Sequence, residues 1–253
     1  MALIHIDHTP QTTRVCQPLN IIVPDPGKMS NIPVRERKVL YLLHGLSDDA
    51  SAWQRYTSIE TLASDYGLVV VMPSAGRSFY TDLPNGQSYF TYLMEELPHY
   101  LADVFDLTPK REDTFIAGVS MGGYGAIKAA LLYPERFLAA ASLSGLLSLK
   151  FLEVYPDDPR QKEFTYVFGD LSKLTGSSND PETWLKKAAS NISALPSLYI
   201  ACGRQDDLYP LNKMFQAECQ SLGINLEFHE EDARHAWYFW DEQIRKFITS
   251  VLG

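Results

Sequence analysis

A serine lies near the middle of the 253-residue chain, between two glycines in the segment GVSMG at 118–122. The apolar, β-prone run 114–117 precedes this segment, and residues 123–130 follow it with small side chains and a helical pattern. So sharp a turn from strand to helix needs glycine on both sides of the serine, because a Cβ there would clash with a strained backbone. The segment matches G-x-S-x-G, the turn that exposes a nucleophilic serine at the edge of a sheet. It therefore predicts an α/β fold with Ser120 as the candidate nucleophile.

Apolar runs alternate with helical patterns along the rest of the chain. The expected strands are residues 2–8, 12–23, 39–43, 68–72, 115–119, 137–143, 198–202 and 225–230. The expected helices are, to within a few residues, 56–66, 88–105, 122–133, 208–222 and 237–251. This alternation favours a mostly parallel sheet with helices on both faces, which begins with an antiparallel pair of strands. The length fits one such α/β domain over residues 1–253.

Two stretches interrupt the pattern. Residues 24–37 contain three prolines and are expected to form a loop. Residues 146–194 contain a polar turn at 176–179 and many aromatic residues, namely Phe151, Tyr155, Phe164, Tyr166, Phe168 and Trp184. This longer stretch is interpreted as an insertion that caps the site, and the alternative is a set of peripheral helices without substrate contact.

The composition limits the classes of partner. The net charge is −9 and no run of Lys and Arg occurs, which argues against binding to nucleic acid or to an anionic membrane surface. No apolar stretch approaches the roughly 18 residues of a membrane span, and the N-terminus lacks the pattern of a signal peptide. The three cysteines, Cys16, Cys202 and Cys219, are too scattered for a disulfide framework or a zinc site. We expect a cytoplasmic protein that uses no metal.

A serine nucleophile needs a base within hydrogen-bond reach and an acid that orients the base. After a G-x-S-x-G serine these partners follow in the order acid, then histidine. Asp206 and Asp207 come directly after the expected strand 198–202, and His235 lies 29 residues beyond Asp206, ahead of the last helix. Adjacent residues point in different directions, so only one aspartate can serve; Asp206 is favoured, with Asp207 as a solvated neighbour. The remaining histidines are assigned surface or structural positions, namely His5, His8, His44, His99 and His229.

The negative charge that develops on an attacked ester needs two N–H donors. One is expected from the backbone of Met121, the residue after the nucleophile. The other is expected from Leu46, in the loop that follows strand 39–43, where Gly45 permits a close approach of the backbone. His44 precedes the serine in sequence and is interpreted as a brace for this loop.

Several separated motifs occur together in a fixed order. They are LLHG at 42–45, Trp53, YTD at 80–82, GVSMGGYGA at 118–126, CGRQD at 202–206 and HAWYFW at 235–240. With these motifs the chain resembles the esterase D-like α/β hydrolases, over nearly its whole length. Within that group it is most similar to the small tributyrin and acetyl esterases of lactic acid bacteria and streptococci.

The resemblance implies an eight-stranded α/β-hydrolase fold and a Ser120–Asp206–His235 triad. It also implies hydrolysis of short-chain acyl esters, from acetyl to butyryl or caproyl and including acetylated sugars and tributyrin, without a cofactor. The related S-formylglutathione hydrolases usually carry histidine at the positions of Val119 and Tyr124, which argues against a thioesterase. Feruloyl esterases and mycolyl transferases share the fold and remain alternatives. A binding protein that had lost catalysis is expected to lack a member of the triad, and all three are present.

Four aromatic residues near the motifs are candidates to line an acyl or sugar pocket: Trp53, Tyr80, Tyr124 and Trp237. The alternative for each is packing in the core. Homo-oligomers are common among such enzymes, but the sequence assigns no exposed apolar stripe to a subunit interface.

Overall fold

The computed structural model of the protein describes residues 1–25, 32–150 and 157–253. The centre of the expected loop 24–37 and two aromatic residues of the expected insertion, Phe151 and Tyr155, lie outside the described residues. Within the described ranges, no helix is long and apolar enough to cross a membrane.

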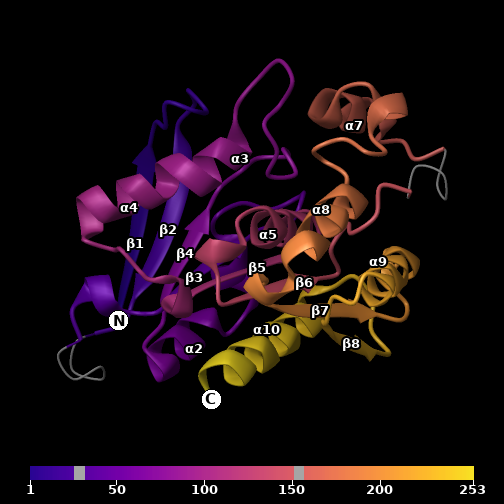
Figure 1. The fold of residues 1–253 in the computed structure, drawn as a ribbon. Helices are drawn as coiled ribbons and strands as arrows, with labels where there is room; N and C mark the ends of the chain where they lie inside the picture. Colours follow the sequence, from indigo (N-terminus) through magenta and orange to yellow (C-terminus); the bar gives the residue numbers. More distant parts are fainter. Residues whose placement is uncertain (26–31, 151–156) are drawn as a thin grey trace.

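One eight-stranded sheet runs through the molecule in the order β1-β2-β4-β3-β5-β6-β7-β8 (Figure 1). The strands are β1 (Ala2–His8), β2 (Gln17–Val23), β3 (Val39–Leu43), β4 (Val69–Pro73), β5 (Thr114–Val119), β6 (Ala139–Leu143), β7 (Ser197–Gly203) and β8 (Glu227–Glu231). The β1–β2 and β2–β4 pairs are antiparallel, and every other neighbouring pair is parallel. The expected α/β-hydrolase sheet, mostly parallel with an antiparallel start, is confirmed.

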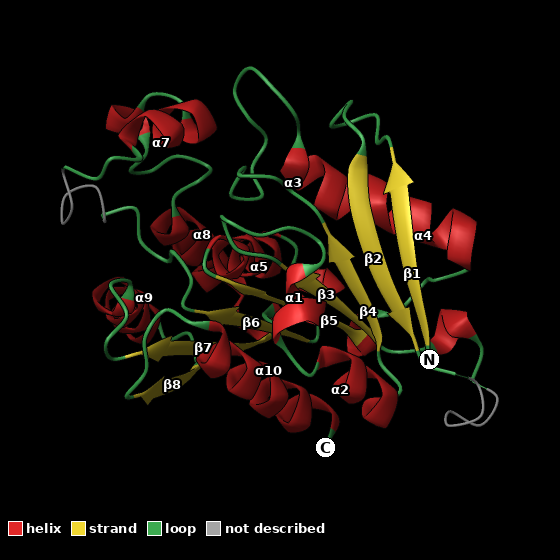
Figure 2. Ribbon diagram, turned by 180° about the vertical axis from the view of Figure 1, so that it is seen from behind, coloured by secondary structure: helices red, strands yellow, loops and turns green. Residues whose placement is uncertain are grey.

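Helices cover both faces of this sheet. One face carries α1 (Ala52–Tyr56), α2 (Ile59–Tyr66) and α10 (Trp237–Leu252), which Figure 2 shows in front. The other carries α3 (Tyr89–Thr91), α4 (Leu97–Phe105), α5 (Met121–Leu132), α8 (Pro181–Ala188) and α9 (Tyr209–Ser221). Strand β3 shows why both layers form: Tyr41 and Leu43 belong to one buried cluster, whereas Leu40 and Leu42 belong to the other. Because side chains alternate along a strand, a continuous apolar run makes a core on each face.

Three strands begin at least two residues later than the sequence predicts, namely β2, β6 and β8, the last of which starts at Glu227 and not at residue 225. Strand β2 starts at Gln17 and not at residue 12, because the N–H groups of Gln11 and Thr12 donate to the Glu96 carboxylate, at 2.6 and 2.9 Å. Strand β6 starts at Ala139 and not at residue 137, since a 3₁₀ turn, η5 (Pro134–Arg136), occupies the chain just before it.

The helix expected over 88–105 contains a break. A π-helical turn, η3 (Tyr92–Glu96), separates α3 from α4. Pro98 has no N–H to donate to the carbonyl four residues earlier, and its ring crowds that carbonyl. The Met94 carbonyl is therefore left for another donor, and Arg136 Nη1 donates to it.

The insertion 146–194 divides into two unlike parts. Helix α8 packs on α5, where Trp184 is buried and its ring lies 4.9 Å from that of Tyr124. Helix α7 (Gln161–Phe168) instead stands apart from the sheet (Figure 1). The connections contain further 3₁₀ turns, η2 (Val34–Glu36), η4 (Arg111–Asp113), η6 (Leu171–Lys173) and η7 (Ala189–Ala194).

Candidate active site

Ser120 occupies the sharp turn between β5 and α5. Its backbone has φ 53° and ψ −115°, a conformation that L-residues seldom adopt and that costs about 1–3 kcal/mol. The Ser120 N–H donates to the Leu143 carbonyl of β6 at 2.9 Å, which anchors the turn to the neighbouring strand. The half-buried side chain stands at the carboxyl edge of the parallel strands, where sites of open α/β sheets collect.

The two glycines of the motif are required by close packing. A Cβ at Gly118 would run into the backbone of Gly122, and a Cβ at Gly122 would run into the Leu43 carbonyl of β3. Both contacts would be far inside van der Waals distance and would involve rigid backbone. The spacing G-x-S-x-G is therefore a condition for seating α5 against β3 and β5.

An acid and a histidine from distant parts of the chain are hydrogen-bonded at the same edge. Asp206 follows β7 and accepts a hydrogen bond from His235 Nδ1 at 2.8 Å through Oδ2. Its other oxygen accepts from the Leu208 N–H at 2.9 Å, and the carboxylate side chain has no exposed surface. Burial works to raise the pKa of Asp206, but the hydrogen bond and charge of His235 outweigh it, so the pKa is lowered and the group stays ionised. The partner of His235 is thus Asp206 and not Asp207.

Two residues that the sequence analysis did not identify support this pair. Ser144, the first residue after β6, accepts a hydrogen bond from the indole N–H of Trp240 at 3.0 Å. Its hydroxyl also interacts with the Asp206 carboxylate and helps to lower the pKa of Asp206. The Trp240 ring meets the His235 ring edge-on, with centroids 4.7 Å apart. The only signal for Ser144 was its position directly after a strand that neighbours those of Ser120 and Asp206.

The loop after β3 lies beside both the serine and the histidine. A Cβ at Gly45 would be 3.7 Å from the Ser120 Cβ and 3.0 Å from Asp48 Oδ2. Burial raises the pKa of the Asp48 carboxyl, with the charge of Asp49 adding to the effect and the charge of His235 opposing it. Leu46 lies between Gly45 and Asp48 in this loop and is half-buried. Its carbonyl accepts a hydrogen bond from Arg77 Nη1 at 3.2 Å. Met121 begins α5, so its N–H has no partner within the helix.

His44 braces this loop, as expected. The buried ring donates from Nδ1 to the Gly45 carbonyl at 2.7 Å and accepts at Nε2 from the Ala75 N–H at 3.0 Å. Burial lowers the pKa of His44 to about 4, so the ring is neutral near pH 7. Both ring nitrogens are occupied, which leaves His44 no free position for general-base chemistry.

Comparison with known proteins adds a family to this geometry. The model of the Esterase family matches residues 16–247. The chain belongs to the Esterase family. The acetyl esterase of Caldicellulosiruptor saccharolyticus is 32% identical over 240 residues, which cover 92% of this chain and 90% of that protein. The enzyme is thus an esterase.

Two solved structures from Staphylococcus aureus match the whole esterase. The fluorophosphonate-binding serine hydrolase FphF, solved with substrate bound, has a TM-score of 0.90 and 35% identity, with 100% of this chain and 98% of that chain covered. The S-formylglutathione hydrolase FrmB has a TM-score of 0.88 and 34% identity, with 100% and 99% covered. Both carry the same α/β-hydrolase arrangement of strands and helices.

Three of the four expected pocket residues of the esterase are buried. Trp53 and Tyr80 are each 1% exposed and Tyr124 is 0% exposed, so the expectation of substrate contact does not hold for them in this conformation. Their polar atoms bind the backbone instead: Trp53 donates to the Leu43 carbonyl at 3.0 Å, and Tyr124 donates to the Asn179 carbonyl at 2.6 Å. The Tyr80 hydroxyl accepts from the His44 N–H at 2.9 Å. These rings support the site loops from behind.

Trp237 differs from these three rings because it is half-buried. Its indole stacks on Tyr56, with centroids 5.1 Å apart, and meets the rings of Trp53 and Trp240 edge-on. Since Trp240 contacts His235, this aromatic group of the esterase extends from the surface to the histidine.

In residues 1–25, 32–150 and 157–253, no three His, Cys, Asp or Glu side chains gather in a way that could hold a metal ion. The three cysteines of the esterase are free thiols, with Cys202 and Cys219 buried and Cys16 exposed.

Proposed function

We propose that this esterase is a serine carboxylesterase that hydrolyses short-chain acyl esters through Ser120, His235 and Asp206. The observation that carries the proposal is the hydrogen bond from His235 to the buried Asp206 carboxylate, at the same sheet edge as the strained turn of Ser120. The fluorophosphonate-binding relative FphF supports a reactive serine, because fluorophosphonates are reagents for such nucleophiles.

In this mechanism His235 takes the proton of Ser120 as the serine oxygen attacks the ester carbonyl. Asp206 holds Nδ1–H of the imidazole, which leaves Nε2 as the base, and stabilises the imidazolium that forms. The N–H groups of Leu46 and Met121 hold the oxyanion. The alcohol leaves with the proton from His235, and water then releases the acid from the acyl-enzyme by the same steps.

The substrate class follows from the relatives and the site together. The Caldicellulosiruptor acetyl esterase supports a short acyl group, from acetyl to butyryl or caproyl. The half-buried Trp237 offers an aromatic face that suits the sugar ring of an acetylated saccharide as well as the glyceride of tributyrin. A small acyl pocket separates chain lengths by about 1–3 kcal/mol per methylene.

A thioesterase is the second candidate, because of the likeness to the S-formylglutathione hydrolase FrmB. Val119 and Tyr124, where such enzymes usually carry histidine, are both fully buried here. These two positions therefore affect packing behind the serine more than substrate contact, which weakens the sequence argument against a thioester. A feruloyl esterase is a further alternative on the same fold, and a non-catalytic binding protein is the remote one.

Rates on p-nitrophenyl esters from acetyl to dodecanoyl test the proposal, beside rates on S-formylglutathione and methyl ferulate. We expect the highest kcat/KM at C2–C6 and its loss in Ser120→Ala, with the fold of the variant intact by circular dichroism. A higher kcat/KM on S-formylglutathione or on methyl ferulate would move the assignment to that class. Unchanged esterase activity in Ser120→Ala would refute the proposed nucleophile.

A further inference from the structure

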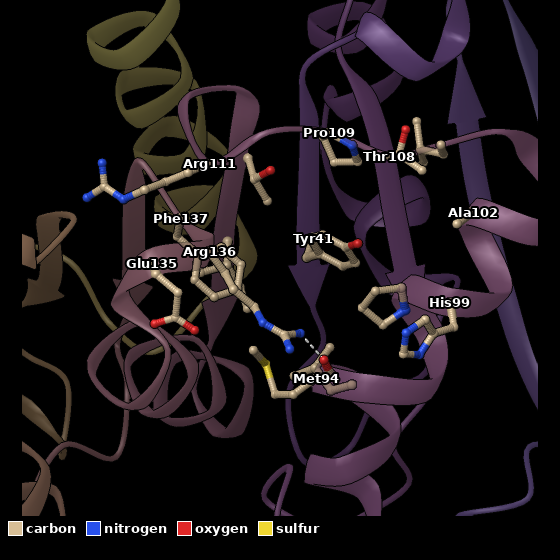
Figure 3. A pocket seen from close by; sticks show the side chains of 15 residues that line it. Tyr41, Met94, His99, Ala102, Thr108, Pro109, Arg111, Glu135, Arg136 and Phe137 are labelled. Atoms are coloured by element: carbon tan, nitrogen blue, oxygen red, sulfur yellow. Dashed lines mark hydrogen bonds between the residues drawn. The ribbon is translucent and has the colours of Figure 1, made fainter.

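A pocket remote from Ser120 lies between α4 and the turn η5, on the face of the sheet that carries α5 (Figure 3). Its volume is about 340 Å³, within the ~300–1,000 Å³ range of small-molecule sites. Thr114 at the start of β5 lines it, whereas Ser120 follows the end of that strand, about 20 Å away at the rise of an extended chain. The pocket is therefore separate from the candidate active site.

Most of the lining is apolar, and one polar group in it lacks a partner. The Tyr41 side chain projects from β3 into the pocket, and Tyr41 is only 7% exposed. Its hydroxyl makes no hydrogen bond to any described residue, unlike that of the buried Tyr80. The hydroxyl oxygen is not sealed from solvent, so it is free to donate a hydrogen bond to a group bound in the pocket.

The Arg136 guanidinium lines the same pocket. Arg136 reaches across the pocket and donates from Nη1 to the Met94 carbonyl, which Pro98 leaves unpaired in the helix (Figure 3). Burial raises the pKa of Tyr41, and the nearby charge of Arg136 opposes that rise, so the two groups are electrostatically coupled. Nε and Nη2 of Arg136 make no hydrogen bond to a described residue and remain as donors.

The other charged groups determine the net charge of the pocket lining. Arg111 and Glu135 also line it, and the Arg111 guanidinium already donates to the carbonyls of Pro134 and Ala194. With the exposed Glu135 included, the lining carries one net positive charge on a protein of net charge −9. His99, which is exposed, also lines the pocket.

We propose that this pocket binds a monocarboxylate with a short apolar chain, its carboxylate held by the Tyr41 hydroxyl and the Arg136 guanidinium. The chain then lies along the Met94 and Leu93 side chains and against Pro98 and Ala102 of α4. An arginine and a phenol together present donors to both oxygens of a carboxylate, whereas a cation would be repelled by Arg136.

The test uses methionine methyl signals of the whole protein labelled at the methionine methyl groups. Met94 lines the pocket, and Met121 follows Ser120, so the two methyls report separately on the pocket and on the candidate active site. Sodium octanoate is the probe, sodium butyrate is the shorter acid expected from the proposed hydrolysis, and 1-octanol is the neutral analogue. Loss of one signal in Met94→Leu assigns the reporter.

We expect octanoate to shift the Met94 methyl saturably, and 1-octanol to bind at least about tenfold more weakly. Tyr41→Phe removes only the hydroxyl and is expected to weaken octanoate binding about tenfold, since a hydrogen bond to a charged group is lost. Ala102→Phe fills the space beside α4 and is expected to abolish the shift. Circular dichroism of both variants checks that they fold.

Other outcomes would overturn the assignment or identify the source of the ligand. No saturable Met94 shift, or equal octanoate affinity in Tyr41→Phe and the wild type, would refute the carboxylate site. Equal binding of 1-octanol would show an apolar pocket without carboxylate recognition, and a shift confined to Met121 would place the acid in the active site alone. Butyrate that binds at Met94 as tightly as octanoate would support the site and point to a product of the enzyme as its ligand.

Discussion

The sheet edge that carries Ser120, Asp206 and His235 is held differently from helix α7 of the insertion. At the sheet edge, close backbone packing and hydrogen bonds to buried groups fix each residue, as in the contact of Gly122 with β3 and the pairing of His235 with the buried Asp206 carboxylate. Helix α7 buries Phe164, Val167 and Phe168 in the core, but its polar link to the site loop is an exposed ion pair, in which Arg77 binds both Glu163 and the Leu46 carbonyl. From this difference we expect the sheet edge to determine whether the reaction occurs, and α7 of the insertion to influence which substrates reach Ser120.

The largest effect is expected from Asp206→Asn. An amide cannot act as an ionised acceptor toward Nδ1–H, so His235 loses the tautomer that the base needs, and kcat should fall by up to about 10⁴-fold with the fold retained. Steady-state kinetics on p-nitrophenyl butyrate measure this loss.

Asp207→Asn is the matched control, since it makes the same change one residue further along, and it should keep kcat within a few fold. If the two variants lost activity equally, the difference assigned to these neighbouring carboxylates would disappear.

A second effect concerns the pH dependence of stability at the His44 brace. Its folded pKa of about 4 lies below the unfolded value of about 6.5, so the unfolded chain binds the proton preferentially between these values. The contribution of the neutral His44 to the free energy of unfolding is fully present above pH 6.5 and is lost as the pH falls toward 4. The loss amounts to about 2 kcal/mol between pH 7 and pH 5. Urea unfolding at both pH values measures it.

His44→Gln removes the titrating ring and should flatten this part of the pH dependence, although the variant starts from a lower stability at pH 7. The same loss of stability between pH 7 and pH 5 in the variant would mean that other groups cause it.

A smaller effect is expected from Ser144→Ala. The variant removes the hydroxyl that faces Asp206 and accepts from Trp240, so the Asp206–His235 pair should be positioned less well. We expect kcat to fall about tenfold with KM little changed, together with a shift of the acid limb of the pH–rate profile, as measured in a pH series of kcat.

Ser142→Ala provides a control two residues earlier, within β6. The Ser142 hydroxyl is buried, and no described residue serves as its hydrogen-bond partner. Its removal should leave kcat unchanged and stability unchanged or slightly higher. A tenfold loss of kcat in both variants would indicate a general disturbance of β6.

The smallest effect on stability is expected from Glu163→Gln in α7. The pair with Arg77 is exposed, so the free energy of unfolding should change by less than about 1 kcal/mol. The chain-length profile of kcat/KM should nevertheless change, because Arg77 also contacts the Leu46 carbonyl. Lys173→Gln, in a surface pair with Asp170 in the turn η6 of the insertion, should alter neither quantity. An unchanged profile in Glu163→Gln would remove the role given to α7.

The sequence predicted the features that depend on neighbouring residues. Continuous apolar runs predicted β3, β4 and β7 to within one residue. A strand that is buried on both faces is apolar at nearly every position, so its ends are marked where polar residues begin. The turn around Ser120 was predicted equally well, because Gly118 packs on Gly122 within the same motif, although the requirement for glycine at 122 comes from the Leu43 carbonyl of β3.

Features that depend on distant contacts were missed. The late start of β2 depends on Glu96, which is more than eighty residues away and takes the N–H groups that a longer strand would have used. The support of Asp206 by Ser144 joins the ends of two separate strands, and no local pattern marks it. The burial of Tyr80 and Tyr124, which the sequence left open as the alternative to substrate contact, likewise follows from packing between elements.

The contact between Gly122 and the Leu43 carbonyl has a consequence for how this enzyme can be altered by directed evolution. A library at Gly118 and Gly122 should yield mostly inactive clones, because a side chain at Gly118 would meet the backbone of Gly122 and one at Gly122 would meet β3. Productive diversity belongs at sites whose neighbours are solvent or flexible side chains, such as Tyr166 on α7 and Tyr238 on α10, both exposed. Substitutions that change the substrate range should therefore arise at positions around the turn, whereas the residues of the turn itself should stay unchanged.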